Sequence, residues 1–209
     1  IYARGAHIGK IKDHFSHYVH LQREAIIAAG NSDIVIMCMG INPGVEGEES
    51  AETGFLGDKP DIELPAEQIE LLEEILKLGK PIVFVNISGS CLNLSRADET
   101  CNAVIQCFYP GAEGGDALAE ILFGKYSPCG RLPVTFYRST DDLPPFNDYN
   151  MENRTYRFFK GTPLYPFGHG LTYGEIKEDW KDENTVVLTN SGKFDTKYSV
   201  LKYSNASKR

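Results

Sequence analysis

The sequence has 209 residues, of which 42% are hydrophobic and 24% charged, as is ordinary for one large globular domain or one domain plus part of another. Its formal net charge of −8 argues against nucleic acid and anionic membranes as partners, because both require a basic surface. No apolar run approaches the roughly 18 residues of a membrane span.

Cysteine and histidine give no reason to expect a metal or other cofactor. The five cysteines are odd in number and lack CxxC spacing, which argues against a disulfide or zinc framework. His14, His17 and His20 recur every three residues and could share one helical face, but a metal site would also need a carboxylate or cysteine partner and a closed geometry. We therefore interpret these histidines as structural or solvent-facing.

Both ends of the sequence look cut. Ile1–Gly5 has neither an initiator Met nor a signal peptide and resembles the tail of a strand. The far end stops shortly after a predicted strand. We expect a fragment of a longer chain.

Apolar runs alternate with amphipathic stretches along the first two thirds of the chain. Buried strands are predicted at 34–39, 81–87, 103–109 and, as an edge strand because of Pro133, at 131–137. Helices are predicted at 21–29, 67–78 and 116–123, with Gly30 as the left-handed cap of the first. This alternation predicts an α/β fold: a three-layer α/β sandwich whose mainly parallel sheet is covered on both faces.

Residues 42–65 form the acidic segment, a connection of about two dozen residues without helical or strand period. Connections in compact α/β domains usually have about 2 to 6 residues, and longer ones are often functional. This one holds seven carboxylates jointed by glycines, which is typical either of a solvated surface or of a loop that reaches into an active site. The carboxylates are Glu46, Glu48, Glu49, Glu52, Asp58, Asp61 and Glu63.

Ligands of parallel α/β sheets bind beyond the carboxyl ends of the strands. The acidic segment, Ser88–Ser90 and Pro110–Gly115 all follow predicted strands. We expect them to converge on one edge of the sheet.

Several familiar chemistries are disfavoured. Pro110–Gly115 lacks the Lys-Ser/Thr of a phosphate-binding loop, and the chain contains no GxSxG or HExxH motif. Carboxylate chemistry remains, and glycosidic cleavage needs a pair of carboxyl groups. Glu48, which follows Gly47, is a suitable acid because partial burial against a sugar would raise its pKa toward neutrality.

The last part of the chain differs in character. Residues 139–173 are rich in Pro, Tyr and Phe and predict an ordered, extended wrap. Weak strand patterns at 185–188 and 198–203, with a turn at 190–192, indicate the first strands of an incomplete β-sandwich.

The motifs occur in the order of a known family. VEGEES, GDKPDIELP, GKPIVFVNISGS, YPGAEGG, GRLPVTF and YPFGHGLTY resemble the C-terminal half of glycoside hydrolase family 3, the β-glucosidases and β-xylosidases. The resemblance covers nearly all of residues 30–173, and the YPGAEGG, GRLPVTF and YPFGHGLTY blocks are its most specific parts. Phe108 departs from it, because many relatives have Trp before Tyr-Pro-Gly.

The resemblance implies a domain at 1–173, and a linker with the start of a truncated fibronectin type III-like module at 174–209. It implies a retaining exo-β-glycosidase that takes no cofactor and shares its carbohydrate substrate with an N-terminal barrel. That barrel would hold the nucleophilic Asp, whereas the acidic segment would supply the acid/base, matched to Glu48 with Glu46 and Glu49 as alternatives. Asp58 would contact substrate. A non-catalytic carbohydrate-binding domain, or one that only supports the barrel, remains the alternative.

Overall fold

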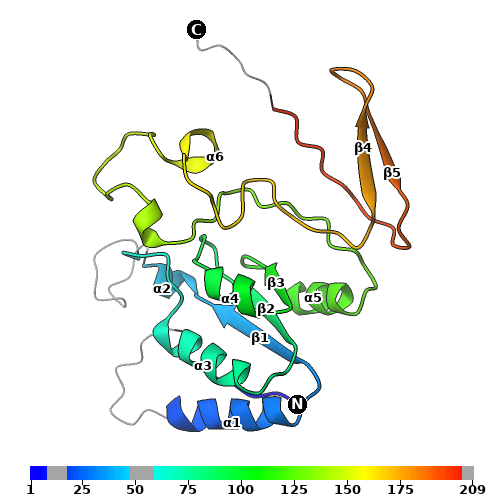
Figure 1. Ribbon diagram of the computed structural model, residues 1–209. Coiled ribbons are helices and arrows are strands. Elements are labelled where there is room, and N and C mark those ends of the chain that lie inside the picture. Colours follow the sequence, from blue (N-terminus) through cyan, green and yellow to red (C-terminus); the bar gives the residue numbers. More distant parts are fainter. Residues whose placement is uncertain (9–17, 48–58, 204–209) are drawn as a thin grey trace. The chain divides into compact units, whose positions relative to one another are not determined.

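The computed structural model describes residues 1–8, 18–47 and 59–203, which divide into two compact units (Figure 1). The first unit comprises Ile1–Gly111 and Phe136–Leu164, and the second comprises Ala112–Thr135 and Tyr165–Arg209.

A parallel sheet is the centre of the first unit. Its strands β1 (Val35–Gly40), β2 (Ile82–Ile87) and β3 (Ala103–Gln106) lie in the order β1-β2-β3. Gly40 pairs with Ile87, so the two longer strands end level with each other. The predicted strands 34–39 and 81–87 are thus confirmed to within a residue at each end. The third strand is shorter than the predicted 103–109, because Phe108 adopts a positive φ of 50° that no strand contains.

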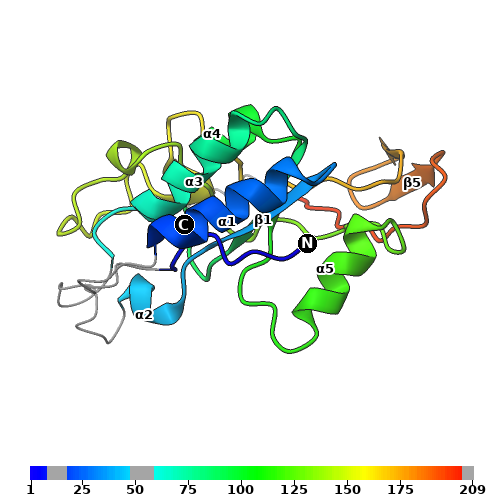
Figure 2. The same ribbon diagram turned by 90° about the horizontal axis from the view of Figure 1, so that it is seen from below.

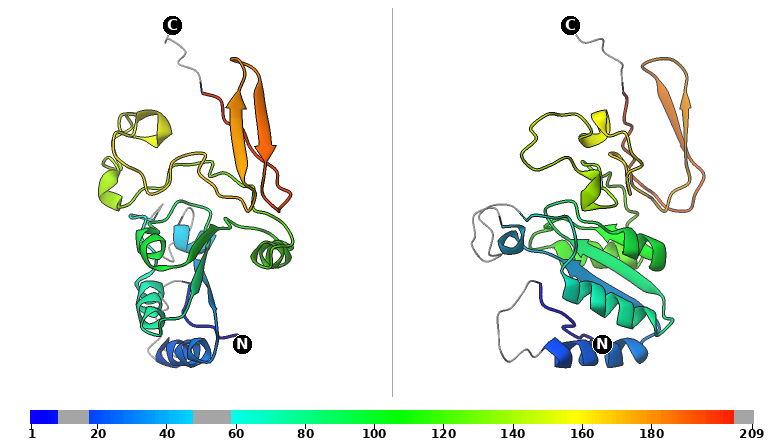
Figure 3. Two further views of the ribbon diagram at one scale, coloured as in Figure 1. Left: turned by 45° about the vertical axis from the view of Figure 1, so that its right-hand side comes forward. Right: turned by 60° about the vertical axis from the view of Figure 1, so that its left-hand side comes forward.

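Three helices pack on one face of this sheet (Figure 3, left). They are α1 (Tyr18–Gly30), α3 (Ala66–Leu76) and α4 (Ser95–Thr100). Helices α1 and α3 lie side by side (Figures 1 and 2). Helix α3 buries Leu71, Leu72 and Ile75, and Phe84 and Val85 of β2 are buried as well, with side chains on opposite faces of the sheet.

The opposite face of the sheet carries Ile36, which is 48% exposed, and Cys38. Within the described part of the first unit, α1, α3 and α4 all lie on the other face, although Val85, the neighbour of Cys38 on β2, is fully buried. The second helical layer of the expected three-layer sandwich is not seen in this unit.

Several local predictions are wrong. Gly30 is the last residue of α1 and does not have the positive φ of a left-handed cap. Residues 1–5 form no strand. Residues 131–137 form no strand either, apart from a single bridge at Phe136, whose carbonyl accepts a hydrogen bond from Leu164. Pro133 has no N–H to give to a ladder, which explains why pairing does not extend along this run.

The chain from Phe136 to Leu164 completes the first unit as an extended wrap, as its composition predicted. It contains two short helical turns, η2 (Thr140–Asp142) and α6 (Thr155–Phe158). Phe136 is fully buried. Tyr137 packs edge-on against Phe159, with the ring centroids 5.0 Å apart.

The second unit holds α5 (Gly114–Leu122) and an antiparallel hairpin of β4 (Ile176–Trp180) and β5 (Val186–Asn190). The helix matches the predicted 116–123 and ends before Gly124, whose φ is 71°. Strand β5 confirms the prediction at 185–188. Strand β4 was not predicted, because its sequence IKEDW has only two apolar residues, and residues 198–203 form no strand.

No helix in the described ranges is both long and apolar enough to cross a membrane.

Candidate functional site

The site is built at the carboxyl edge, the edge of the first unit's sheet where β1, β2 and β3 end. Beyond β1 the chain makes one helical turn, α2 (Pro43–Glu46). The Asn42 side chain accepts a hydrogen bond from the Val45 N–H at 3.0 Å and caps this turn. Gly47 ends it with a φ of 87°, a left-handed conformation that glycine adopts without strain. The acidic segment therefore begins with helical structure, contrary to the sequence prediction.

The α2 turn carries Glu46 to the end of β2. Its Oε1 accepts hydrogen bonds from the Ser90 backbone N–H at 2.8 Å and from the Ser90 hydroxyl at 2.9 Å. Glu46 is half-buried, whereas Ser90 is exposed. The expected meeting of the acidic segment with Ser88–Ser90 is thus seen at these two residues.

A buried polar network supports the backbone of Ser90. The Ser88 hydroxyl donates to the Ser90 carbonyl at 2.7 Å and accepts from the Asn86 amide at 2.9 Å. The same amide reaches the Gln106 side chain at 2.6 Å, and Gln106 in turn donates to the Ser88 carbonyl. Asn86 and Ser88 are fully buried. The hydrogen bond from Ser88 ties the Ser90 carbonyl to the sheet beneath it, although Asn86 Oδ1 is buried without a hydrogen-bond partner among the described residues.

Tyr109 reaches the same carboxylate from the end of β3. Its hydroxyl hydrogen-bonds to Glu46, and partial burial together with this bond raises the pKa of Tyr109 to about 12. The left-handed backbone of Phe108 directly precedes it. Positive φ at a bulky residue is strained and persists where the surroundings impose it.

Gly89 makes room for this arrangement. A Cβ at this position would lie 2.6 Å from the Tyr109 ring and 3.1 Å from Glu46 Oε1. Any larger residue at 89 would push the ring and the carboxylate apart. The glycine is therefore required by close packing.

The far end of the acidic segment returns to the same place. The Lys59 N–H donates to the Glu46 carbonyl at 2.8 Å. Further on, Glu63 accepts from the Asn93 amide at 2.9 Å, and the Asn93 N–H donates to the Ile62 carbonyl at 2.7 Å. The described chain on either side of residues 48–58 is therefore joined at the carboxyl edge.

The predicted site residues divide into two groups. Glu46 lies at the carboxyl edge as just described. Glu48, Glu49 and Asp58 lie outside the described residues. Tyr109 was not predicted, although its place directly after a buried strand could have indicated it.

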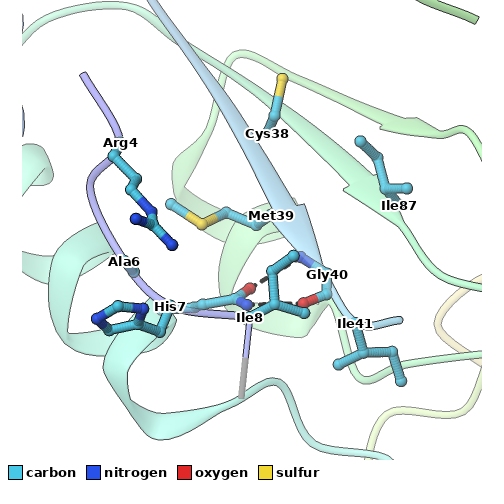
Figure 4. A pocket seen from close by; sticks show the side chains of 10 residues that line it. Arg4, Ala6, His7, Ile8, Cys38, Met39, Gly40, Ile41 and Ile87 are labelled. Carbon is cyan, nitrogen blue, oxygen red and sulfur yellow. Dashed lines mark hydrogen bonds between the residues drawn. The ribbon is translucent and has the colours of Figure 1, made fainter. Parts of the chain in front are cut away.

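A small hollow of about 130 Å³ lies beside the end of β1, between the strand and residues 4–8 (Figure 4). Arg4, His7 and Cys38 are its charged or titratable lining residues, and Met39, Ile41 and Ile87 contribute apolar surface. Ligand pockets usually measure about 300–1,000 Å³. The hollow is too small for a sugar ring with its substituents, and we interpret it as a packing feature. Nor do the described residues gather three or more His, Cys, Asp or Glu side chains that could hold a metal ion.

The fold and this edge define an α/β domain that presents carboxylates beyond its strand ends. The family model of the glycosyl hydrolase family 3 C-terminal domain matches residues 6–173. The chain belongs to this family.

Curated relatives agree with this assignment. The chain is 46% identical over 183 residues to a xylan 1,4-beta-xylosidase of Xylanibacter ruminicola, covering 81% of this chain and 21% of that protein. It is 33% identical over 194 residues to a periplasmic beta-glucosidase of Salmonella typhimurium, covering 81% of this chain and 24% of that protein. The chain thus spans about a fifth to a quarter of the length of these relatives.

Solved structures show the same fold. A GH3 exo-beta-xylosidase, XlnD, in complex with a xylobiose aziridine probe superposes with a TM-score of 0.79 at 28% identity, covering 94% of this chain and 29% of that chain. A beta-glucosidase of Erythrobacter marinus superposes with a TM-score of 0.72 at 33% identity, covering 92% of this chain and 29% of that chain. The α/β fold expected from the sequence is therefore shared with glycoside hydrolases.

Proposed function

We propose that this chain is the C-terminal domain of a retaining exo-β-glycosidase that hydrolyses terminal, non-reducing β-glucosides or β-xylosides. The observation that carries the proposal is the joining of the acidic segment to the carboxyl edge on both sides of residues 48–58, by Glu46 to Ser90 and by Ile62 and Glu63 to Asn93. The names of the relatives, β-xylosidases and β-glucosidases, support the class of substrate.

The proposed mechanism divides two carboxyl groups between two domains. An Asp on a preceding barrel attacks the anomeric carbon, and Glu48 protonates the departing glycosidic oxygen. Glu48 then takes a proton from water, which attacks the glycosyl–Asp ester and releases the sugar. Retention requires the two carboxyl groups to lie about 5–5.5 Å apart. Glu46 and Glu49 are the alternatives for the acid/base, and Asp58 is proposed to bind substrate.

The domain boundaries follow from the same proposal. Residues 1–173 form the sandwich domain, and 174–209 begin a fibronectin type III-like module. The antiparallel pairing of β4 with β5 supports the start of such a module. Because the nucleophile is assigned to another domain, the 209-residue chain alone is expected to be inactive.

The test uses the protein encoded together with the residues upstream of Ile1. Glu48→Gln should lower kcat/KM for an unactivated xyloside or glucoside by about 10²–10⁴-fold, as for loss of a general acid. It should spare the glycosylation step for 4-nitrophenyl glycosides, whose leaving group departs without a proton. Unchanged kinetics in the Glu46, Glu48 and Glu49 variants would instead favour a domain that only binds sugar or supports the barrel.

A further inference from the structure

We propose that Glu46 is a positioning residue that anchors the acidic segment to the carboxyl edge, through the cluster of Glu46, Ser90 and Tyr109, and that it does not transfer the proton. The inference deepens the proposed function and rests on it. It separates Glu46 from the two other candidates for the acid/base.

The carboxylate oxygens of Glu46 are already engaged by hydrogen-bond donors. An acid/base residue must carry a proton on one oxygen in half of the catalytic cycle. Oε1 of Glu46 already accepts two hydrogen bonds, one from a backbone N–H and one from a hydroxyl of Ser90. The Tyr109 hydroxyl also donates to this carboxylate. A carboxylate that accepts three donors is suited to hold its neighbours in place.

The residues that donate to Glu46 are themselves held in place. Ser90 is held from below by the hydrogen bond that its carbonyl accepts from Ser88. Tyr109 follows the strained Phe108 and packs over Gly89, where no Cβ could fit. The donors thus come from the ends of two neighbouring strands, and both are fixed by the sheet.

Glu46 in turn holds the returning end of the acidic segment. Its backbone carbonyl accepts a hydrogen bond from the Lys59 N–H. The chain continues from Glu46 through Gly47, which has a left-handed backbone conformation. One residue therefore ties β1, β2, β3 and the returning chain together at the carboxyl edge. Correct placement of a catalytic group is worth a large rate factor, and small misplacements cost up to about a hundredfold.

The experiment compares Glu46→Gln, Ser90→Ala and Tyr109→Phe with Glu48→Gln and Glu49→Gln in the protein that includes the residues upstream of Ile1. Each variant is assayed with a 4-nitrophenyl glycoside and with the disaccharide. For Glu46→Gln we expect kcat/KM to fall roughly ten- to hundredfold by the same factor for both substrates. Added azide should not restore activity, and the basic limb of the pH profile should remain. Ser90→Ala and Tyr109→Phe should show the same pattern with smaller losses.

The proposal is overturned if Glu46→Gln slows the disaccharide selectively, loses the basic limb of its pH profile, and is rescued by azide with formation of a β-glycosyl azide. In that product a carbon–nitrogen bond replaces the glycosyl–Asp bond, so the missing group is the base of the second step. Unaltered kinetics in all three anchor variants would also overturn it. Failure of the proposed function is a separate result, in which none of the three Glu variants shows a leaving-group dependence.

Discussion

Gln68 on α3 binds both backbone polar groups of Gly40 at the end of β1. Its Nε2 donates to the Gly40 carbonyl at 2.6 Å, and its Oε1 accepts the Gly40 N–H at 2.8 Å (Figure 4, dashed lines). Gln68 is only 3% exposed. The side chain thus acts like one more strand partner, and it holds the chain at the point where β1 passes into the acidic segment.

Gln68→Leu should therefore destabilise the protein. It keeps an apolar side chain of similar size but leaves a buried N–H and a buried carbonyl of Gly40 without their partner. Each such loss costs about 1–3 kcal/mol, so the free energy of unfolding should fall by about 2–6 kcal/mol, measured by urea denaturation. Glu74→Gln, on an exposed position of the same helix, is the control and should change it by less than about 0.5 kcal/mol. An equal effect of both variants would contradict this role of Gln68.

Gly40 itself should tolerate no side chain. Its φ is 132°, and an added Cβ would lie 1.9 Å from the Ile87 carbonyl oxygen. Gly40→Ala should cost more than about 4 kcal/mol or prevent accumulation of soluble protein. Gly30→Ala is the matched control, because nothing lies within 4 Å of its added Cβ and its φ is not positive. It should be neutral or stabilise by up to about 1 kcal/mol. Thermal unfolding followed by circular dichroism distinguishes the two results.

The strands of the sheet and the helices that pack on it were predictable because hydrophobic periodicity determines them. The runs 34–39 and 81–87 have few polar side chains, and α3 has a clear apolar face, so local pattern and tertiary packing agree. At residues 131–137 the local pattern indicated a strand, but pairing depends on backbone donors, and Pro133 has none. Strand β4 shows the reverse case, since cross-strand pairing with β5 forms it despite a polar sequence.

The carboxyl edge was predictable in its location but not in its contacts. Parallel strands end together, so a meeting of the acidic segment with Ser88–Ser90 followed from topology alone. Which carboxylate faces Ser90 depends on the single turn of α2 and on the left-handed Gly47, and neither has a period to detect. The contact of Tyr109 with Glu46 depends on the positive φ of Phe108, which is unusual for that residue type.

Cys38 should react slowly with iodoacetamide at neutral pH although the residue is exposed on the helix-free face of the described first unit. Desolvation raises the pKa of its thiol above the usual value of 9.0, and the thiolate is the reactive form. The alkylation rate at Cys38, followed by mass spectrometry of its peptide, should therefore keep rising above pH 9. Cys38→Ser identifies the peptide signal. A rate that levels off below pH 9 would show that the thiol is not desolvated.

Tyr109 should report directly on the charge of Glu46. The phenol has an ordinary pKa of 10.0, raised to about 12 by burial and by the hydrogen bond to the Glu46 carboxylate. Between these two values the folded protein keeps a proton that the unfolded chain has lost. Stability should therefore fall as pH rises from 10 to 12, and this part of the fall should be absent in Tyr109→Phe. Glu46→Gln removes the negative charge that opposes the phenolate, so it should lower the pKa of Tyr109. This pKa is measured by ultraviolet titration, as the difference between each protein and the same protein carrying Tyr109→Phe. Glu63→Gln, on the returning chain, is the control and should leave that titration unchanged. If Glu46→Gln also leaves it unchanged, the carboxylate and the phenol are not in contact in solution.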